Sequence, residues 1–134
     1  MSVDIQAGDV HLWFVCTTEI QNPLLLQQYY KILNSAEADK NKRFVFAKDK
    51  KCHLVTRALI RTVLSKYIPS VEPKEWRFSN NEYGKPAVDS EMLPFPLEFN
   101  LSHAGDMIVL ALSVGQALGV DVEPLNREID DSLA

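Results

Sequence analysis

The stretch LEFNLSHAGDMIVLALSVGQALGVDVE, residues 97–123, decides the fold class of this chain. Its β-branched and large apolar runs are interrupted by glycine-containing segments, a pattern typical of short antiparallel strands. Gly115-Gln116 is the expected tight hairpin turn between the last two runs, because glycine adopts a positive φ without steric cost. The three strands are expected at 97–102, 107–114 and 117–123.

The chain before this stretch is mainly helical after an opening strand, VHLWFVC at residues 10–16. Asn22-Pro23 supplies an N-cap and a first-turn proline for a helix to about residue 33. Ser35 is the expected cap of the next helix. A longer helix is expected from Asp49 to Ile68, because apolar residues recur at steps of three and four. This apolar stripe consists of Cys52, Val55, Leu59 and Val63.

A connecting region joins the helices to the strands. Residues 73–78 are expected to turn into a short strand, and residues 79–96, with two Asn, one Gly and three Pro, read as loop. Helices come first and a meander of strands follows, so the predicted fold class is α+β.

Length and composition place the chain among globular domains. Its 134 residues suffice for one core, and contents of 46% hydrophobic and 24% charged residues exclude a disordered chain. No window approaches the ~20 apolar residues that span a bilayer. The first ten residues also lack the order of a secretory signal. Cys16 and Cys52 lie far apart without metal-ligand spacing, so we expect reduced thiols in a cytoplasmic protein that does not associate with a membrane.

The charge is unevenly distributed along the chain. Residues 40–51, KNKRFVFAKDKK, carry six cations and one acid, a balance of +5, so a net charge of -4 leaves -9 for the rest. One basic stretch in an acidic chain favours a phosphorylated small molecule or an acidic partner over a nucleic acid. The alternative is a solvated helix face.

Asp121 and Glu123 are the first candidates for chemistry. Alternate residues of a strand share a face and lie ~6–7 Å apart, so both carboxylates would point the same way. Two converging carboxylates suit Mg²⁺, which prefers oxygen ligands and keeps water and substrate phosphates in its shell. The alternative is an ordinary half-buried strand with a polar outer face.

Ser102 and His103, at the end of a predicted strand, form the second candidate. A nucleophile–base pair is rejected, because neighbours on a strand point to opposite faces and no G-x-S-x-G elbow surrounds this serine. Hydrogen bonding to phosphate oxygens is the better role, and a simple turn is the alternative. Gly84-Lys85-Pro86 could present a positioned cation from a loop, although such a tripeptide is often only a turn.

In combination, EYGKP (82–86), FNLSHAGD (99–106) and LGVDVEP (118–124) resemble the signature of the 4'-phosphopantetheinyl transferase superfamily. The chain is most similar to the N-terminal half of the larger, pseudo-dimeric class that activates surfactin synthetase and similar assembly lines. KRF at 42–44, the long helix and WRFSNNEYGKP resemble that class too. The likeness covers about residues 35–124, and three motifs in the correct order make it specific.

The resemblance implies one half of a pseudo-twofold α+β architecture with coenzyme A in the cleft between halves. It also implies Mg²⁺-dependent transfer of the phosphopantetheine arm to a serine of an acyl or peptidyl carrier protein, as in fatty-acid, polyketide and nonribosomal-peptide biosynthesis. The residues it assigns to coenzyme A are Lys40, Lys51, Gly84, Lys85, Pro86, Ser102 and His103. Those it assigns to catalysis are Asp121, Glu123 and His103, with Asp121 and Glu123 holding Mg²⁺.

One departure from the family pattern is large. The W-x-x-K-E-A motif, whose glutamate completes the family's metal site, does not occur in these 134 residues. We therefore expect residues 1–124 to be an N-terminal subdomain and 125–134 to begin the connection to a C-terminal subdomain. Truncation is the favoured explanation, and a second chain that supplies the other half is the alternative.

Two other functions stay open at this point. A non-catalytic module that binds carrier proteins or nucleotides would account for the basic stretch and the missing Lys-Glu motif. A Mg²⁺-dependent phosphohydrolase is less favoured, because no water-activating base is evident.

Overall fold

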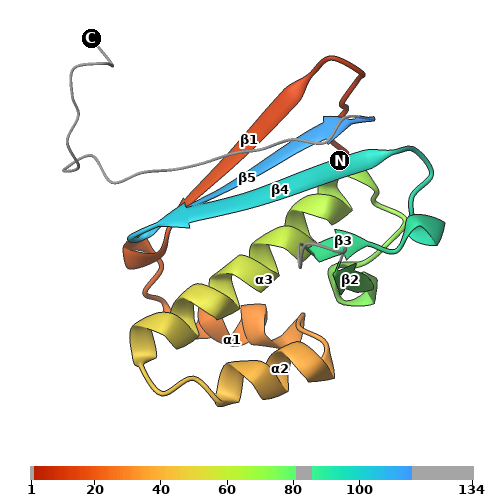
Figure 1. Ribbon diagram of the computed structural model, residues 1–134. Helices are drawn as coiled ribbons and strands as arrows, with labels where there is room; N and C mark the ends of the chain where they lie inside the picture. The colour runs from red at the N-terminus through yellow and green to blue at the C-terminus, as the bar shows by residue number, and fades with distance from the viewer. Residues whose placement is uncertain (1, 81–85, 116–134) are drawn as a thin grey trace, which may run out of the picture.

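In the computed structural model, residues 2–80 and 86–115 are described, and they form a helical layer against one face of an antiparallel sheet (Figure 1). The sheet has the order β1-β5-β4. Its strands are β1 (Val10–Cys16), β4 (Leu97–Ala104) and β5 (Met107–Val114). Helices on one side of an antiparallel sheet confirm the predicted α+β class.

Three α-helices form the other layer, and α1 and α2 pack against the long α3. They are α1 (Pro23–Lys31), α2 (Ser35–Lys42) and α3 (Ala47–Tyr67). Single 3₁₀ turns follow β1 and flank the second sheet: η1 (Thr17–Glu19), η2 (Pro73–Glu75) and η3 (Ser90–Met92). The opening strand and all three helices are confirmed. None of the helices within the described ranges has the length and apolarity to cross a membrane.

The helix starts follow from their capping residues. Asn22 caps α1 as predicted, since its side-chain oxygen accepts the Leu24 N–H at 2.9 Å. The prediction that Ser35 caps α2 is wrong, because Asn34 takes that position. The Asn34 side chain accepts the Glu37 N–H at 2.8 Å, and the Glu37 carboxylate accepts the Asn34 N–H at 3.0 Å. This reciprocal pair of hydrogen bonds is a capping box formed by Asn34, the residue before Ser35, and Glu37.

The sheet corrects the predicted order of strands. β1 pairs antiparallel with β5, from Val10 opposite Ser113 to Cys16 opposite Met107, and β4 occupies the other edge of β5. Both edges of β5 are therefore occupied within the described residues. The expected hairpin at Gly115-Gln116 falls on a segment of which only Gly115 is described. Residues 117–123 themselves lie outside the described residues. The sequence could not show this pairing, since it joins segments about 90 residues apart.

β4 continues two residues beyond the predicted end, to Ala104, and turns tightly into β5. Gly105 adopts a φ of 59° in this two-residue turn, a conformation that favours glycine. The turn places Asp106 beside the start of β5. It also fixes the end of the strand that carries Ser102 and His103.

A small second sheet corrects the prediction of an uninterrupted loop. β2 (Phe78–Asn80) pairs antiparallel with β3 (Pro86–Val88), although residues 79–96 were expected to form loop throughout. Proline is tolerated at the first residue of a strand, so Pro86 does not prevent the pairing. Residues 81–85, with Gly84 and Lys85, connect these two strands and lie outside the described residues.

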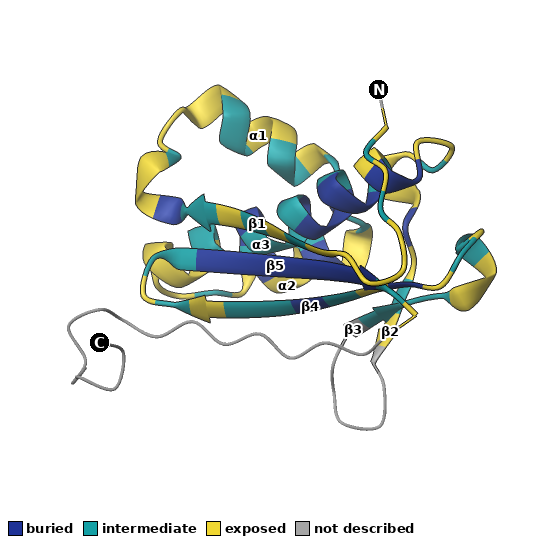
Figure 2. Cartoon of the chain, turned by 90° about the horizontal axis from the view of Figure 1, so that it is seen from above, coloured by how far each residue is buried: buried dark blue, intermediate teal, exposed yellow. Residues whose placement is uncertain are grey.

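The core lies between α3 and the sheet. Ile60 and Leu64 of α3 are fully buried against Leu110 and Leu112 of β5, with Trp76 beside them. Figure 2 shows β5 buried along most of its length. Val55 and Val63 of the predicted stripe are buried, which confirms the face of α3 that packs inward. At the other face of the sheet, Val10, Leu12 and Phe14 of β1 are exposed.

A buried ion network ties α2 and the segment after α3 to α3 itself. Arg61 Nε donates to Glu37 Oε1 at 2.8 Å, and Arg57 Nε donates to Glu37 Oε2 at 2.6 Å. Arg61 Nη1 also donates to the backbone carbonyls of Pro73 and Trp76, both at 2.9 Å. The network sets where α2 and β2 begin relative to α3, and both elements contribute to the site below.

Candidate functional site

The start of α3 meets the β4–β5 turn at one end of the sheet. Lys48 Nζ lies 3.8 Å from Asp106 Oδ1, and the Thr17 N–H donates to the Asp106 carbonyl at 2.8 Å. A cavity of about 430 Å³ opens here. Its lining residues are Thr17, Thr18, Ala47, Lys48, Lys51 and Asp106. We call this the α3 cavity.

The α3 cavity has the features of an anion site. No side chain caps the start of α3, because Phe46 at the N-cap position provides none. Uncapped N–H groups and the positive end of the helix dipole favour a bound anion. Lys48 and Lys51 add two cations, and the hydroxyl of Thr18 can donate to a phosphate oxygen. The Thr17 hydroxyl already donates to the Asp106 carbonyl at 3.3 Å.

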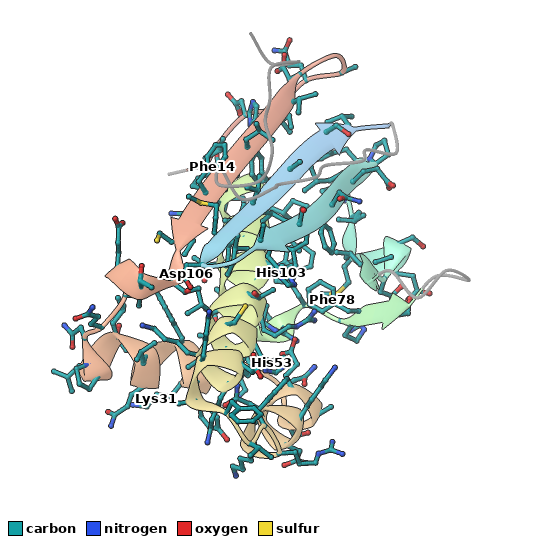
Figure 3. All side chains as sticks on the ribbon, turned by 60° about the vertical axis from the view of Figure 1, so that its left-hand side comes forward. Phe14, Lys31, His53, Phe78, His103 and Asp106 are labelled. Atoms are coloured by element: carbon teal, nitrogen blue, oxygen red, sulfur yellow. The ribbon has the colours of Figure 1, made fainter. Side chains whose placement is uncertain are left out.

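Ser102 and His103 lie on the strand that leads into this turn, but they face opposite sides of the sheet. Alternation along β4 places His103 on the side of Phe99 and Leu101, which pack against the α3 core. Ser102 lies on the other side. Figure 3 labels His103 and Asp106 at the same end of the sheet, over α3. His103 is therefore the member of the pair on the α3 side.

A second cavity, of about 520 Å³, lies on the α2 side of α3. We call it the α2–α3 cavity. Lys40, His53, Thr56, Arg57 and Ser79 supply its donors and cations, and the ring of Phe78 forms part of its wall. Glu37 is its acid, and that carboxylate is already bound by two arginines. Lys40 and Lys51, both predicted to bind coenzyme A, line different cavities.

His53 is held as a neutral hydrogen-bond donor in the α2–α3 cavity. Its Nδ1 lies 3.0 Å from the Asn41 amide nitrogen, which also donates to the Lys50 carbonyl. An amide nitrogen can only donate, so Nδ1 accepts and Nε2 carries the proton. Burial and the charges of Lys40 and Arg57 hold the pKa of His53 below its ordinary value of 6.5.

Glu37 is held as an anion beside it. Burial alone would raise the pKa of this carboxyl, but the Asn34 N–H and the positive charges of Arg57 and Arg61 outweigh burial and lower the pKa. The carboxylate therefore stays charged across the neutral range. It anchors the helix that carries Lys40.

Four of the predicted site residues lie outside the described residues: Gly84, Lys85, Asp121 and Glu123. Pro86 begins β3 and pairs with Asn80, one residue after Ser79 of the α2–α3 cavity. Asn80, the last described residue before Gly84 and Lys85, therefore directly follows a residue that lines that cavity. Within residues 2–80 and 86–115, no cluster of three His, Cys, Asp or Glu side chains could hold a metal ion.

Several residues of the two cavities were not singled out from the sequence. Lys48 lies inside the basic stretch, so the start of the long helix could have drawn attention to it. His53 and Arg57 are four residues apart on one face of α3, a spacing that brings side chains together. Thr17 and Asp106 carry no such signal, because the pairing of β1 with β5 brings them together.

Comparison with known proteins places these features in a family. Residues 22–115, more than half of the chain, match the family model described as 4'-phosphopantetheinyl transferase, N-terminal. The chain is 28% identical over 134 residues to the 4'-phosphopantetheinyl transferase HetI of Nostoc sp., covering 99% of this chain and 55% of HetI. It is 36% identical over 92 residues to the transferase gsp of Aneurinibacillus migulanus, covering 69% and 35%.

The fold also matches a solved structure. A holo-(acyl-carrier-protein) synthase of Bacillus anthracis, in complex with CoA (3',5'-ADP), superposes with a TM-score of 0.54 at 15% identity, over 77% of this chain and 91% of the synthase. The present chain spans about half or less of the length of the curated relatives named above. The match to the family model over residues 22–115 shows that the chain belongs to the 4'-phosphopantetheinyl transferase family.

Proposed function

We propose that the protein containing this chain transfers the 4'-phosphopantetheine arm of coenzyme A to a carrier-protein serine. The observation that carries the proposal is the meeting of the α3 lysines with the β4–β5 turn, marked by the 3.8 Å contact between Lys48 and Asp106. A cationic, donor-rich cavity next to the His103 strand suits the phosphates of coenzyme A. Family membership supports the same reaction.

The two cavities suggest how the ADP portion is shared. Lys40, His53 and Arg57 in the α2–α3 cavity would bind the 3'-phosphate and adenine end. Lys51 and His103 would bind the pyrophosphate at the start of α3. The predicted contact of Ser102 with coenzyme A is not part of this arrangement, because Ser102 lies on the other side of β4 from His103.

The reaction is a phosphoryl-group substitution. The serine oxygen of the carrier protein forms a bond to the β-phosphorus of the pyrophosphate, and the bond from that phosphorus to the bridging oxygen breaks. The serine proton is released, and 3',5'-ADP leaves with the electron pair. Negative charge accumulates on the phosphoryl oxygens in the transition state, so fixed cations such as Lys51 lower the barrier.

Magnesium is part of this proposal through Asp121 and Glu123. Two carboxylates on alternate positions of a strand provide oxygen ligands of the kind that Mg²⁺ prefers, and the bound ion would neutralise charge on the pyrophosphate. The neutral His53, by contrast, is suited to donate a hydrogen bond rather than to coordinate a metal, because its Nδ1 already accepts from Asn41.

The test is a transfer reaction with the complete protein, an apo carrier protein, Mg²⁺ and coenzyme A labelled in its pantetheine arm. We expect the label on the carrier serine and one 3',5'-ADP per transfer. Binding of coenzyme A without transfer would identify a non-catalytic module, and release of inorganic phosphate would identify a hydrolase. Either outcome overturns the proposal.

Matched variants identify the residues involved. Asp121→Ala and Glu123→Ala are each expected to abolish transfer while the protein remains folded by circular dichroism. Glu98→Ala, which removes an exposed acid from β4, is the control and should keep wild-type activity. Full activity of both Asp121→Ala and Glu123→Ala would exclude the proposed metal site.

A further inference from the structure

A third cavity, an apolar groove, lies between α1 and the first turns of α3. Its volume is about 640 Å³. Its floor consists of apolar and aromatic side chains from both helices. These are Pro23, Leu26, Tyr30, Ala47 and Leu54.

The rim of the α1–α3 groove is positively charged. Lys42 from the end of α2 and Lys50 and Lys51 from α3 line it, and none of its lining residues is acidic. Lys42 and Lys50 are exposed, and the structure shows neither in an ion pair with a described residue. An apolar floor with a rim of one charge is complementary to an amphipathic helix with acidic residues beside its apolar stripe.

Exposed apolar side chains occur close in sequence to the lining residues of the groove. Leu24 on α1 is 67% exposed, and Val45 and Phe46, just before α3, are 87% and 70% exposed. Large apolar residues that gather beside a groove mark a site of association more often than a bare solvent face. Leu24 follows the lining residue Pro23 in the sequence, and Val45 and Phe46 come just before the lining residue Ala47.

The groove is also next to the proposed phosphate site. Lys51 lines both the α1–α3 groove and the α3 cavity with Thr17, Lys48 and Asp106. A protein seated in the groove would therefore lie beside the phosphates of bound coenzyme A. That position suits the macromolecular substrate of the reaction.

We propose that the α1–α3 groove docks an acidic amphipathic helix of the carrier protein, with its apolar face on Leu26 and Leu54 and its acids on Lys42 and Lys50. The inference rests on the proposed function and extends it to the recognition of the second substrate. A nucleic acid fits less well, because the floor is apolar. Docking by the α1 helix of a second copy fits less well too, because α1, whose sequence is PLLLQQYYK, carries no acid.

The test uses the double variant Lys42→Glu/Lys50→Glu of the complete protein. Only the backbone carbonyl of Lys50 accepts the Asn41 hydrogen bond, so the side-chain change leaves that contact in place. We expect the KM for apo carrier protein to rise about tenfold or more, since reversed charges at an interface repel the partner. The KM for coenzyme A should change less than twofold. Lys51 is left unchanged because it also lines the phosphate site.

Lys31→Glu/Lys66→Glu is the matched control, because it makes the same change in net charge at exposed lysines outside the groove. We expect wild-type KM values for both substrates from this control. A carrier protein whose helix acids are changed to lysine should regain binding to Lys42→Glu/Lys50→Glu. A role in folding alone would not produce that recovery.

Calorimetric titration of apo carrier protein into the wild type and the two double variants distinguishes failure of the docking proposal from failure of the transferase proposal. Loss of binding in Lys42→Glu/Lys50→Glu alone supports the groove even if turnover is absent. Equal binding by the wild type and both double variants overturns the docking proposal and leaves the transferase proposal standing. If the folded wild-type protein does not transfer the phosphopantetheine arm, that result alone overturns the transferase proposal.

Discussion

At the scale of single residues, the buried Glu37–Arg61 contact contributes to stability. Arg61 is fully buried, and its guanidinium serves both the carboxylate of α2 and backbone carbonyls of residues 73–76. Removing one partner of a buried ion pair leaves an uncompensated charge in a medium of low polarity.

The first prediction is that Arg61→Ala lowers the free energy of unfolding by roughly 3–5 kcal/mol, the range for breaking a buried pair. Urea unfolding followed by circular dichroism measures it. Arg43→Ala removes an exposed arginine and should stay within about 0.5 kcal/mol of the wild type. Equal changes in the free energy of unfolding for the two variants would show that the buried network adds no more stability than an exposed arginine does.

The second prediction concerns acid. The pKa of Glu37 is lower in the folded protein than its ordinary value of 4.5, so its stabilising contribution is present above pH 4.5 and is lost as the pH falls through the folded pKa. Glu37→Gln lacks this contribution at every pH. The stability difference between wild type and Glu37→Gln should therefore shrink as the pH falls below 4.5.

Urea unfolding at a series of pH values between neutral and acid conditions measures this difference. Glu98→Gln, at an exposed position, should track the wild type at every pH. A difference between wild type and Glu37→Gln that stays constant from neutral to acid pH would contradict the lowered pKa of Glu37.

At the scale of elements, local sequence patterns predicted which helices and strands are present better than the residues at which they begin and end. The apolar spacing of Val55 and Val63 placed α3, and β-branched runs placed β1, β4 and β5, because these patterns depend on neighbours in the chain. The pairing of β1 with β5 joins residues about 90 positions apart, so no local pattern could show it. The cap of α2 was misplaced by one residue, since Asn34 and Ser35 are both good N-caps.

That ambiguity gives the third prediction. Asn34→Ala removes the capping-box acceptor of the Glu37 N–H and should destabilise the protein by about 1 kcal/mol. Ser35→Ala, one residue later in the first turn, should be neutral within about 0.5 kcal/mol. Thermal or urea unfolding of both variants decides between the two caps. A larger effect from Ser35→Ala would contradict the observed α2 start.

At the scale of the whole molecule, the sequence motifs and the structure each supply part of the site. The motifs pointed to Lys40, Lys51, Ser102 and His103 as ligands of coenzyme A. The structure separates Lys40 from Lys51 into two cavities on either side of α3, a division that charge along the chain could not predict. Lys48 lines the α3 cavity with Lys51, and His53 and Arg57 line the α2–α3 cavity with Lys40. These groupings depend on how the elements pack around α3.

The most direct test of the account is the KM for coenzyme A of the complete protein carrying Lys51→Gln. A charged hydrogen bond is worth about 1.5–3 kcal/mol, so its loss at the α3 cavity predicts a KM increase of about tenfold or more. Lys66→Gln, which neutralises an exposed lysine at the far end of α3, should leave the KM unchanged. An unchanged KM in Lys51→Gln would contradict the claim that the start of α3 binds the phosphates of coenzyme A.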